Sequence, residues 1–311
     1  MRNISINGIT VLPGQEVNID ISISRLPTHT LIDLPVYVFR GKKEGPSLLL
    51  TAGIHGDEIN GIEIIRRLLE KKALMPEKGT VIAIPLVNIY GFIHTARSLP
   101  DGKDLNRCFP GSRSGSLANQ LAYIIMKEII PNVDCGIDFH TGGSRISNFP
   151  HIRCVLSHPY NIELASMFGP PYIMNSDLID KSFRKEAFKR EKTILVYEGG
   201  ESLRLDEKAI NEGTNGVLRL MNNLGMTRKD VEHQISVVLT SSNWLRAKVS
   251  GIFNSSIEYG QEINKNQTLG TITDPYGQTK FLIKSPNKGY VLGINNMPVV
   301  NAGDAIFNIG N

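Results

Sequence analysis

The sequence places one histidine and two acidic residues within four positions, His55, Asp57 and Glu58, where an apolar run passes into an amphipathic segment. A catalytic zinc ion takes three protein ligands and keeps a further position open for water. A histidine and a glutamate three residues apart, in a loop at the end of a strand, can point at one ion. The alternative is that Asp57 and Glu58 only favour the start of the next helix through its dipole.

A third metal ligand is required, and His140 is the best candidate. It closes the apolar run CGIDFH at residues 135–140 and precedes Thr-Gly-Gly, which again indicates the end of a strand. Asp138 lies two residues earlier and therefore on the same face of that strand, where it could support His140 from behind. His151 and His158 lie in segments that look like loops, and we consider them weaker candidates.

A loop rich in Pro and Gly, TARSLPDGKDLNRCFPG, concentrates Arg97, Asn106 and Arg107. The planar fork of arginine suits carboxylates because it can donate two parallel hydrogen bonds. The alternative is a solvated basic loop without a ligand.

A further carboxylate, Glu198, ends the β-rich run TILVYE immediately before two glycines. A zinc hydrolase needs a carboxylate that takes a proton from water and delivers it to the leaving nitrogen. Glu201 is the rival for this role, but it lies beyond the glycines.

The elements that must position these residues alternate between strands and helices. Residues 1–45 are predicted to form short strands, and SLLLTAG at 47–53 is typical of a strand buried on both faces. A helix is expected next, with its apolar stripe at Ile59, Ile62, Ile65 and Leu69. Further strands are predicted at 80–88, 133–140 and 193–198, and further helices at 117–130 and 212–226. This alternation indicates an α/β layered core.

The residue pattern changes near residue 236. After this point short β-rich runs alternate with turns that contain Gly, Asn and Pro. Residues 251–272 resemble residues 289–309 in the layout of their glycines and apolar positions, which suggests two similar halves. This pattern resembles the barrel-sandwich fold of biotinyl and lipoyl carriers. We therefore predict a catalytic domain at 1–235 and a C-terminal all-β module at 236–311, which either borders the site entrance or serves assembly.

Composition limits the partners. The formal net charge is +4, and Lys and Arg are scattered without a dense basic stripe, so nucleic acid is not expected. No apolar run approaches the roughly 20 residues that a membrane span needs, and no secretory signal is recognisable. Three cysteines without C-x-x-C spacing favour a reduced, cytoplasmic setting. Edge strands in the C-terminal module are compatible with a homo-oligomer.

Four motifs in this order resemble the succinylglutamate desuccinylase/aspartoacylase family of zinc carboxypeptidase-like hydrolases: H-G-D-E, D-L-N-R-x-F-P-G, D-F-H-T-G-G and a strand-terminal Glu. The resemblance implies a mixed sheet flanked by helices. It implies one zinc ion (Zn2+) per chain held by His55, Glu58 and His140, with Glu198 as general base and acid. The same resemblance leaves the role of Asp57 open.

The resemblance further implies that Arg97 polarises the scissile carbonyl, while Asn106 and Arg107 hold a substrate carboxylate. The expected activity is amide hydrolysis, with removal of the acyl group from a small, carboxylate-bearing N-acyl amino acid or related amine. The alternatives are a metallocarboxypeptidase acting on peptides and a non-catalytic binding protein on the same fold. A non-haem iron oxygenase also uses two histidines and a carboxylate, but typically without this set of Arg, Asn and Glu.

Overall fold

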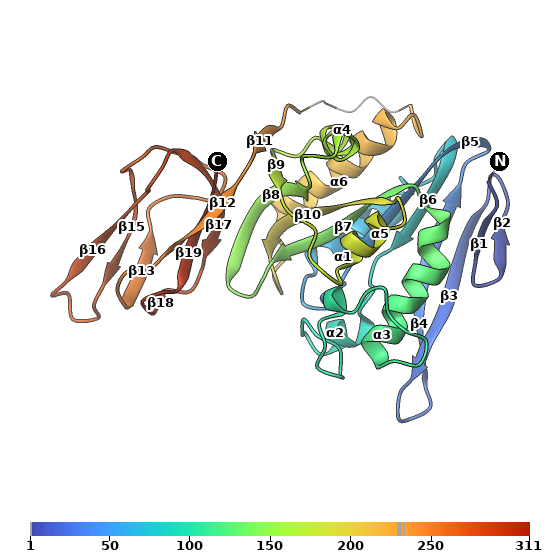
Figure 1. Ribbon diagram of the computed structural model, residues 1–311, viewed down its shortest axis with the longest axis horizontal. Helices are drawn as coiled ribbons and strands as arrows, with labels where there is room; N and C mark the ends of the chain where they lie inside the picture. Colours follow the sequence, from blue (N-terminus) through green and yellow to red (C-terminus); the bar gives the residue numbers. More distant parts are fainter. Residues whose placement is uncertain (1, 229–231, 233) are drawn as a thin grey trace.

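The computed structural model describes residues 2–228, 232 and 234–311 (Figure 1). The strands of the first part are β1 Ile4–Ile6, β2 Ile9–Val11, β3 Glu16–Arg25, β4 Leu31–Arg40, β5 Lys43–Ala52, β6 Lys78–Ile84, β7 Cys135–Gly142, β8 Ile146–Cys154, β9 Tyr172–Asn175 and β10 Thr193–Glu201. The helices are α1 Asn60–Glu70, α2 Ile89–Ile93, α3 Leu117–Ile124, α4 Pro159–Phe168, α5 Phe183–Phe188 and α6 Glu207–Asn223. None of the helices described is long and apolar enough to cross a membrane.

The strands after residue 236 are β11 Val237–Leu239, β12 Ser242–Arg246, β13 Gly251–Ser255, β14 Glu262–Ile263, β15 Thr268–Thr273, β16 Lys280–Lys284, β17 Gly289–Asn295, β18 Val299–Val300 and β19 Ala305–Gly310. The largest sheet runs in the order β12–β19–β17–β8–β10–β7–β5–β6–β4–β3. Its centre is parallel, since β5 pairs in parallel with both β6 and β7, and β7 with β10. The sheet is therefore mixed, as predicted.

Two apolar cores cover the two faces of this sheet. Along β5, Leu48 and Leu50 belong to one core and Leu49 to the other, because successive side chains of a strand point to opposite faces. All three are fully buried. Helices α1, α4 and α6 pack on the first face, whereas α3 and the β1–β2 hairpin pack on the second. The sheet is thus a rigid middle layer whose strand ends can carry a site.

Helix α1 forms where predicted, but the predicted buried stripe is partly wrong. Ile59, Ile62 and Leu69 are only half-buried, while Ile64, Ile65 and Leu68 are fully buried together with the small residues Asn60 and Gly61. Gly61 explains the rotation, because a Cβ atom there would lie 2.4 Å from the Cβ of Phe139 on β7. The helix meets the sheet through its smallest residue, which brings the start of α1 close to β7.

Among the described residues after 236 the elements are all strands, and their pairing is symmetric. β13 pairs with β15 and with the short β18, and β17 pairs with β19 and with the short β14. This matches the internal similarity between residues 251–272 and 289–309. β17 also pairs with β8, so β17, β19 and β12 continue the largest sheet beyond β8 (Figure 1).

Candidate active site

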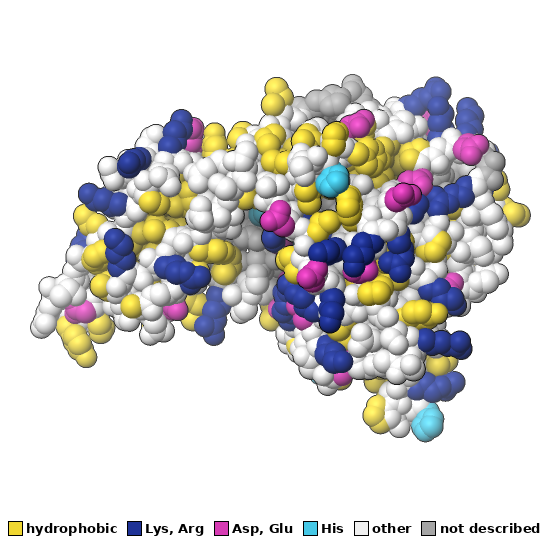
Figure 2. Space-filling model, viewed as in Figure 1, with side chains coloured by type: hydrophobic (Ala, Val, Ile, Leu, Met, Phe, Trp, Pro, Cys, Tyr) yellow, Lys and Arg dark blue, Asp and Glu magenta, His cyan; other side chains and the backbone are white. Residues whose placement is uncertain are grey.

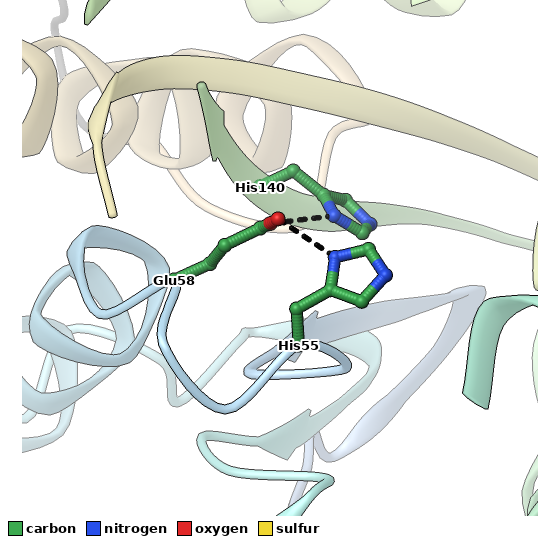
Figure 3. A group of neighbouring side chains, drawn as sticks. All are labelled: His55, Glu58 and His140. Atoms are coloured by element: carbon green, nitrogen blue, oxygen red, sulfur yellow. Dashed lines mark hydrogen bonds and ion pairs between the residues drawn. The ribbon is translucent and has the colours of Figure 1, made fainter. Parts of the chain in front are cut away.

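The three residues predicted to hold the metal converge at one point (Figure 3). His55 and Glu58 come from the loop between β5 and α1, and His140 comes from β7. Their donor atoms lie within 4.8 Å of one another. Nδ1 of His55 is 2.7 Å from Oε1 of Glu58, and Nδ1 of His140 is 2.8 Å from Oε2 of the same carboxylate. All three side chains are almost fully buried.

The loop between β5 and α1 takes its shape from glycines on each side of His55. Gly53 ends the strand with φ of 65°, a backbone conformation that glycine adopts without strain. Gly56 lies against α2, and a Cβ there would fall 2.0 Å from the carbonyl carbon of Gly91. The loop is therefore tight, and it turns His55 and Glu58 inward toward the end of β7.

The other nitrogen of each ring faces an aspartate. Nε2 of His140 is 2.7 Å from Oδ2 of Asp138, and Nε2 of His55 is 3.1 Å from Oδ1 of Asp104. Asp138 is itself fixed by Thr51, whose hydroxyl donates to Oδ1 over 2.8 Å. Such carboxylates orient the rings of metal-binding histidines. The position predicted for Asp138 is thus what the structure shows, whereas the contact of Asp104 was not anticipated.

This arrangement fits a bound cation. Each imidazole faces carboxylate oxygens with both of its nitrogens, yet a neutral imidazole has one N–H and can donate to only one of them. A cation between the two Nδ1 atoms and Glu58 removes the conflict. Each Nε2–H then donates to its aspartate, while each Nδ1 lone pair faces the ion. Two imidazole nitrogens and one carboxylate are also a ligand set that zinc accepts in catalytic sites.

The electrostatics of the group agree with this reading. Burial disfavours the charged form of Glu58, but His55 and His140 outweigh burial and hold the pKa of Glu58 well below its ordinary value. Burial also lowers the pKa of each histidine. Nevertheless Glu58 and Asp104 raise the pKa of His55, and Asp138 and Glu58 raise that of His140. The site concentrates carboxylate charge that a cation would neutralise.

Glu198 lies on β10 and lines the same cavity, which has a volume of about 370 Å³. Its carboxylate is 7% exposed and accepts hydrogen bonds from Nδ2 of Asn148 and from the guanidinium of Arg153, both over 3.2 Å. The rival Glu201 does not line this cavity. It accepts from the backbone N–H of Arg145 and from the amide of Asn296. Of the two glutamates, Glu198 therefore faces the cavity and Glu201 does not.

The residues predicted from the basic loop also reach the cavity. Arg97 donates to Oε1 of Glu58 over 3.1 Å and to Asp104 over 3.0 Å. Oδ1 of Asn106 accepts from the backbone N–H of Phe183, which fixes the amide group. Arg107 is exposed and donates to the carbonyl of Asn106. The seven predicted site residues thus lie around one cavity, although their roles follow from the chemistry and not from these contacts.

Several lining residues were missed in the sequence. Arg153 and the buried Arg184 approach the cavity from β8 and α5, and burial, with the like charge of Arg153, lowers the pKa of Arg184 to about 10. His151 lies in β8 and lines the cavity, so its reading as a loop residue was wrong. No local motif marks these positions, because His151 and Arg153 reach the cavity through the pairing of β8 with β10, and Arg184 reaches it from a separate helix.

The C-terminal strands supply a wall of the cavity, at Ser242, Trp244, Leu292 and Asn308. Figure 2 shows the surface hollowed between these strands and the rest of the chain, with Lys and Arg side chains gathered beside the hollow. The turn residue Tyr276 is 82% exposed and does not line the cavity. The wall is built from strand residues and not from the turns.

The chain is similar to known proteins over most of its length. Residues 44–224 match the succinylglutamate desuccinylase/aspartoacylase catalytic domain. The chain is 28% identical to N-alpha-acetyl-L-2,4-diaminobutyric acid deacetylase of Halomonas elongata over 294 residues, which cover 88% of this chain and 84% of the relative.

Two solved structures share the fold. One is a succinylglutamate desuccinylase/aspartoacylase of Rhodobacter sphaeroides, with a TM-score of 0.81, 24% identity and coverage of 96% of this chain and 95% of the other. The second is the product-bound ectoine utilization protein EutE (DoeB) of Ruegeria pomeroyi, with a TM-score of 0.81, 20% identity and coverage of 95% and 94%. The matched domain spans more than half of the chain, and the chain therefore belongs to the succinylglutamate desuccinylase/aspartoacylase family.

Proposed function

We propose that the protein is a zinc-dependent amide hydrolase that removes the acyl group from a small N-acyl amino acid or related N-acyl amine. The observation that carries the proposal is the convergence of His55, Glu58 and His140 on one point of the cavity that Glu198 also lines. The Halomonas elongata relative is named for deacetylation of an N-acetylated amino acid. The family and this relative support the deacylase class, and the donor set supports the metal.

His55, Glu58 and His140 would hold one zinc ion per chain. When bound, zinc would activate a water molecule and polarise the amide carbonyl. Asp104 and Asp138 keep the two rings oriented, because each accepts a hydrogen bond at the nitrogen that faces away from the ion.

Glu198 moves the proton. Its carboxylate takes a proton from the attacking water and then delivers that proton to the departing nitrogen. Arg153 and Asn148 each donate to one of its oxygens, which leaves a second lone pair on each oxygen free to accept the proton. The same residue can therefore serve as base and as acid without changing position.

Arg97 and Arg107 are assigned to two different negative charges, the oxyanion that forms during the reaction and a carboxylate of the substrate. Arg97 lies against Glu58, where a guanidinium can stabilise the oxyanion that forms as the carbonyl is attacked. Arg107 and Asn106 lie farther along the loop and are assigned to a substrate carboxylate. The amide of Asn106 is suited to this because its oxygen is already occupied by Phe183, which directs the NH2 group to a ligand.

The size of the cavity favours a small substrate over a peptide. Its volume of about 370 Å³ is at the lower end of ligand sites, and Trp244 and Asn308 close one side. We retain the division into a catalytic domain at 1–235 and a C-terminal module at 236–311 as part of this proposal. We propose that this module is a barrel-sandwich. It contributes one wall of the cavity and no catalytic group.

A substrate panel tests the proposal. Zinc-loaded protein is assayed on N-acetyl and N-succinyl amino acids, on N-acetylated diamino acids and on short peptides with a free C-terminus. We expect release of the acyl group from at least one N-acyl amino acid and no cleavage of the peptides. Preferential peptide cleavage would show a carboxypeptidase, and no turnover on any substrate would show a binding protein on this fold.

A further inference from the structure

Three neighbouring strands place a second histidine beside Glu198. Glu198 on β10 is in register with His140 on the parallel strand β7 and with His151 on the antiparallel strand β8. Residues paired in this way present their side chains to the same face of the sheet, and all three line the cavity. His151 thus lies on the side of Glu198 that is opposite the candidate metal site.

The hydrogen bonds of His151 define its tautomer. Nδ1 is 2.7 Å from the carbonyl oxygen of Phe149, and a carbonyl oxygen only accepts, so Nδ1 carries a hydrogen. The side chain is 4% exposed, and burial lowers its pKa although Glu198 opposes that effect. The ring is therefore neutral, and its Nε2 is a hydrogen-bond acceptor.

Nε2 of His151 makes no hydrogen bond to any of the residues that the structure describes. Two donors that line the same cavity are directed to other acceptors. Arg153 donates to Glu198 and to Ser176, and Asn148 donates to Glu198. The cavity thus presents two acceptors at paired positions of neighbouring strands, the Glu198 carboxylate and Nε2 of His151, and a ligand with an N–H group can donate to His151.

A secondary amide supplies such a donor. Its nitrogen carries one hydrogen, and that nitrogen must receive a proton from Glu198 when the bond to the acyl carbon breaks. As the carbon becomes tetrahedral the nitrogen becomes pyramidal, and its lone pair must then point at the proton on Glu198. A fixed acceptor for the N–H hydrogen determines that direction.

We propose that Nε2 of His151 accepts the hydrogen bond of the scissile amide N–H and keeps it as the amine forms. The inference rests on the proposed function and adds to it a residue that contacts the leaving nitrogen. In the balanced step, the water oxygen has bonded to the acyl carbon and its proton has passed to Glu198. The carbon–nitrogen bond then breaks as the carbonyl re-forms, and its electron pair leaves with the nitrogen. The nitrogen gains the proton held by Glu198, and its original hydrogen stays in place. His151 transfers no proton. The contribution of His151 is consequently confined to N–H amides, because the leaving oxygen of an ester has no hydrogen to donate.

The test compares an N-acyl amino acid with the matching O-acyl hydroxy acid, using zinc-loaded wild-type protein, His151→Phe and His151→Gln. Phenylalanine keeps a flat ring but has no acceptor, whereas the glutamine carbonyl can accept. We expect His151→Phe to lower kcat on the amide about 10- to 100-fold, the effect of one lost hydrogen bond to the reacting group. The kcat on the ester should stay within about twofold, and His151→Gln should recover part of the amide activity.

His158→Phe is the matched control, because His158 packs against Phe188 outside the cavity. It should leave both activities unchanged. An equal loss of amide and ester hydrolysis in His151→Phe would overturn the inference, since His151 would then act on Glu198 or on the fold. Unchanged amide hydrolysis in that variant would overturn it too. Wild-type protein that cleaves no amide would instead overturn the proposed function, and the inference with it.

Discussion

Two regions surround the cavity, and they differ in how their residues come together. The metal side consists of the β5–α1 loop and the end of β7. His55 and Glu58 are three residues apart in the loop, and His140 lies in the last part of the strand. The opposite side consists of β8, β12, β17 and β19, whose lining residues are scattered between Ile146 and Asn308. Local chain geometry places His55 beside Glu58, and the parallel pairing of β5 with β7 brings His140 to them. The opposite side depends on strand pairing alone.

The difference suggests a division of labour. The metal side is buried and held by interlocking hydrogen bonds among ionisable groups. The opposite side is mixed, with Trp244 36% exposed and the amide of Asn308 facing the cavity. The chemistry is therefore expected to depend on the first side and the choice of substrate on the second. Glu198 lies between the two sides, and we group it with the metal side because it takes part in the chemistry.

The largest expected effect separates Glu198 from its neighbour Glu201. Glu198→Gln keeps the shape of the side chain but removes the basic carboxylate, so kcat should fall about 100- to 10,000-fold while the metal content stays that of the wild type. Steady-state kinetics and metal analysis of the same preparation measure both. Glu201→Gln is the matched control and should remain active; the reverse pattern would move the general base to Glu201.

The next effect tests how far the metal side extends. Asp138→Asn retains the size of the side chain but weakens its hold on His140, so metal affinity should fall about 10- to 100-fold. Competition with a chelator of known affinity measures it. Asp20→Asn, an exposed position on β3, should leave the affinity unchanged. An unaltered metal affinity in Asp138→Asn would show that His140 does not need the Asp138 carboxylate at Nε2 to bind the metal.

The arginines should separate binding from turnover. Arg107→Ala should raise KM for a carboxylate-bearing substrate by the equivalent of about 2 kcal/mol, the low end for a broken charge pair because Arg107 is exposed. Arg97→Ala should lower kcat instead, because its partner charge develops in the transition state. Kinetics on one substrate resolve the two, and purely KM-type effects at both positions would contradict the assignment.

The smallest effect concerns the opposite side. Trp244→Ala should enlarge the cavity and shift the ratio of kcat/KM between bulky and small acyl groups by about tenfold, with the metal content unchanged. Competing substrates in one reaction measure the ratio directly. Tyr276→Ala serves as the control, since that side chain is exposed on a turn away from the cavity. An unchanged ratio in Trp244→Ala would mean that this wall does not select substrates.

The two regions were not equally predictable from the sequence. His55, Glu58 and His140 stand at the ends of apolar runs beside glycines, and those signals are local. His151 and Arg153 lie in NFPHIRC, where Pro150 argues against a central strand because proline cannot donate to a sheet. The structure nonetheless places this segment in β8, in the middle of the largest sheet. The missed residues are thus those whose position depends on strand register.

The C-terminal strands show the same limit in another form. Their internal similarity predicted two related halves, because the repeated glycines and apolar positions are visible in the sequence, and β13 and β17 each pair with one short strand. The pairing of β17 with β8 could not be predicted, because no residue pattern in either strand indicates which strand it pairs with. That one pairing places Leu292 and Asn308 at the cavity. Repetition can be read from a sequence, whereas docking between distant strands cannot.

The measurement that tests the account most directly is a metal titration followed by turnover. Protein is stripped with a chelator, zinc is added back in steps, and hydrolysis of an N-acyl amino acid is followed for the wild type and for His140→Ala. The account predicts no activity without metal, recovery that is complete at one zinc per chain, and neither stoichiometric binding nor recovery in His140→Ala. Turnover by the metal-free protein, or stoichiometric zinc retained by His140→Ala, would contradict it.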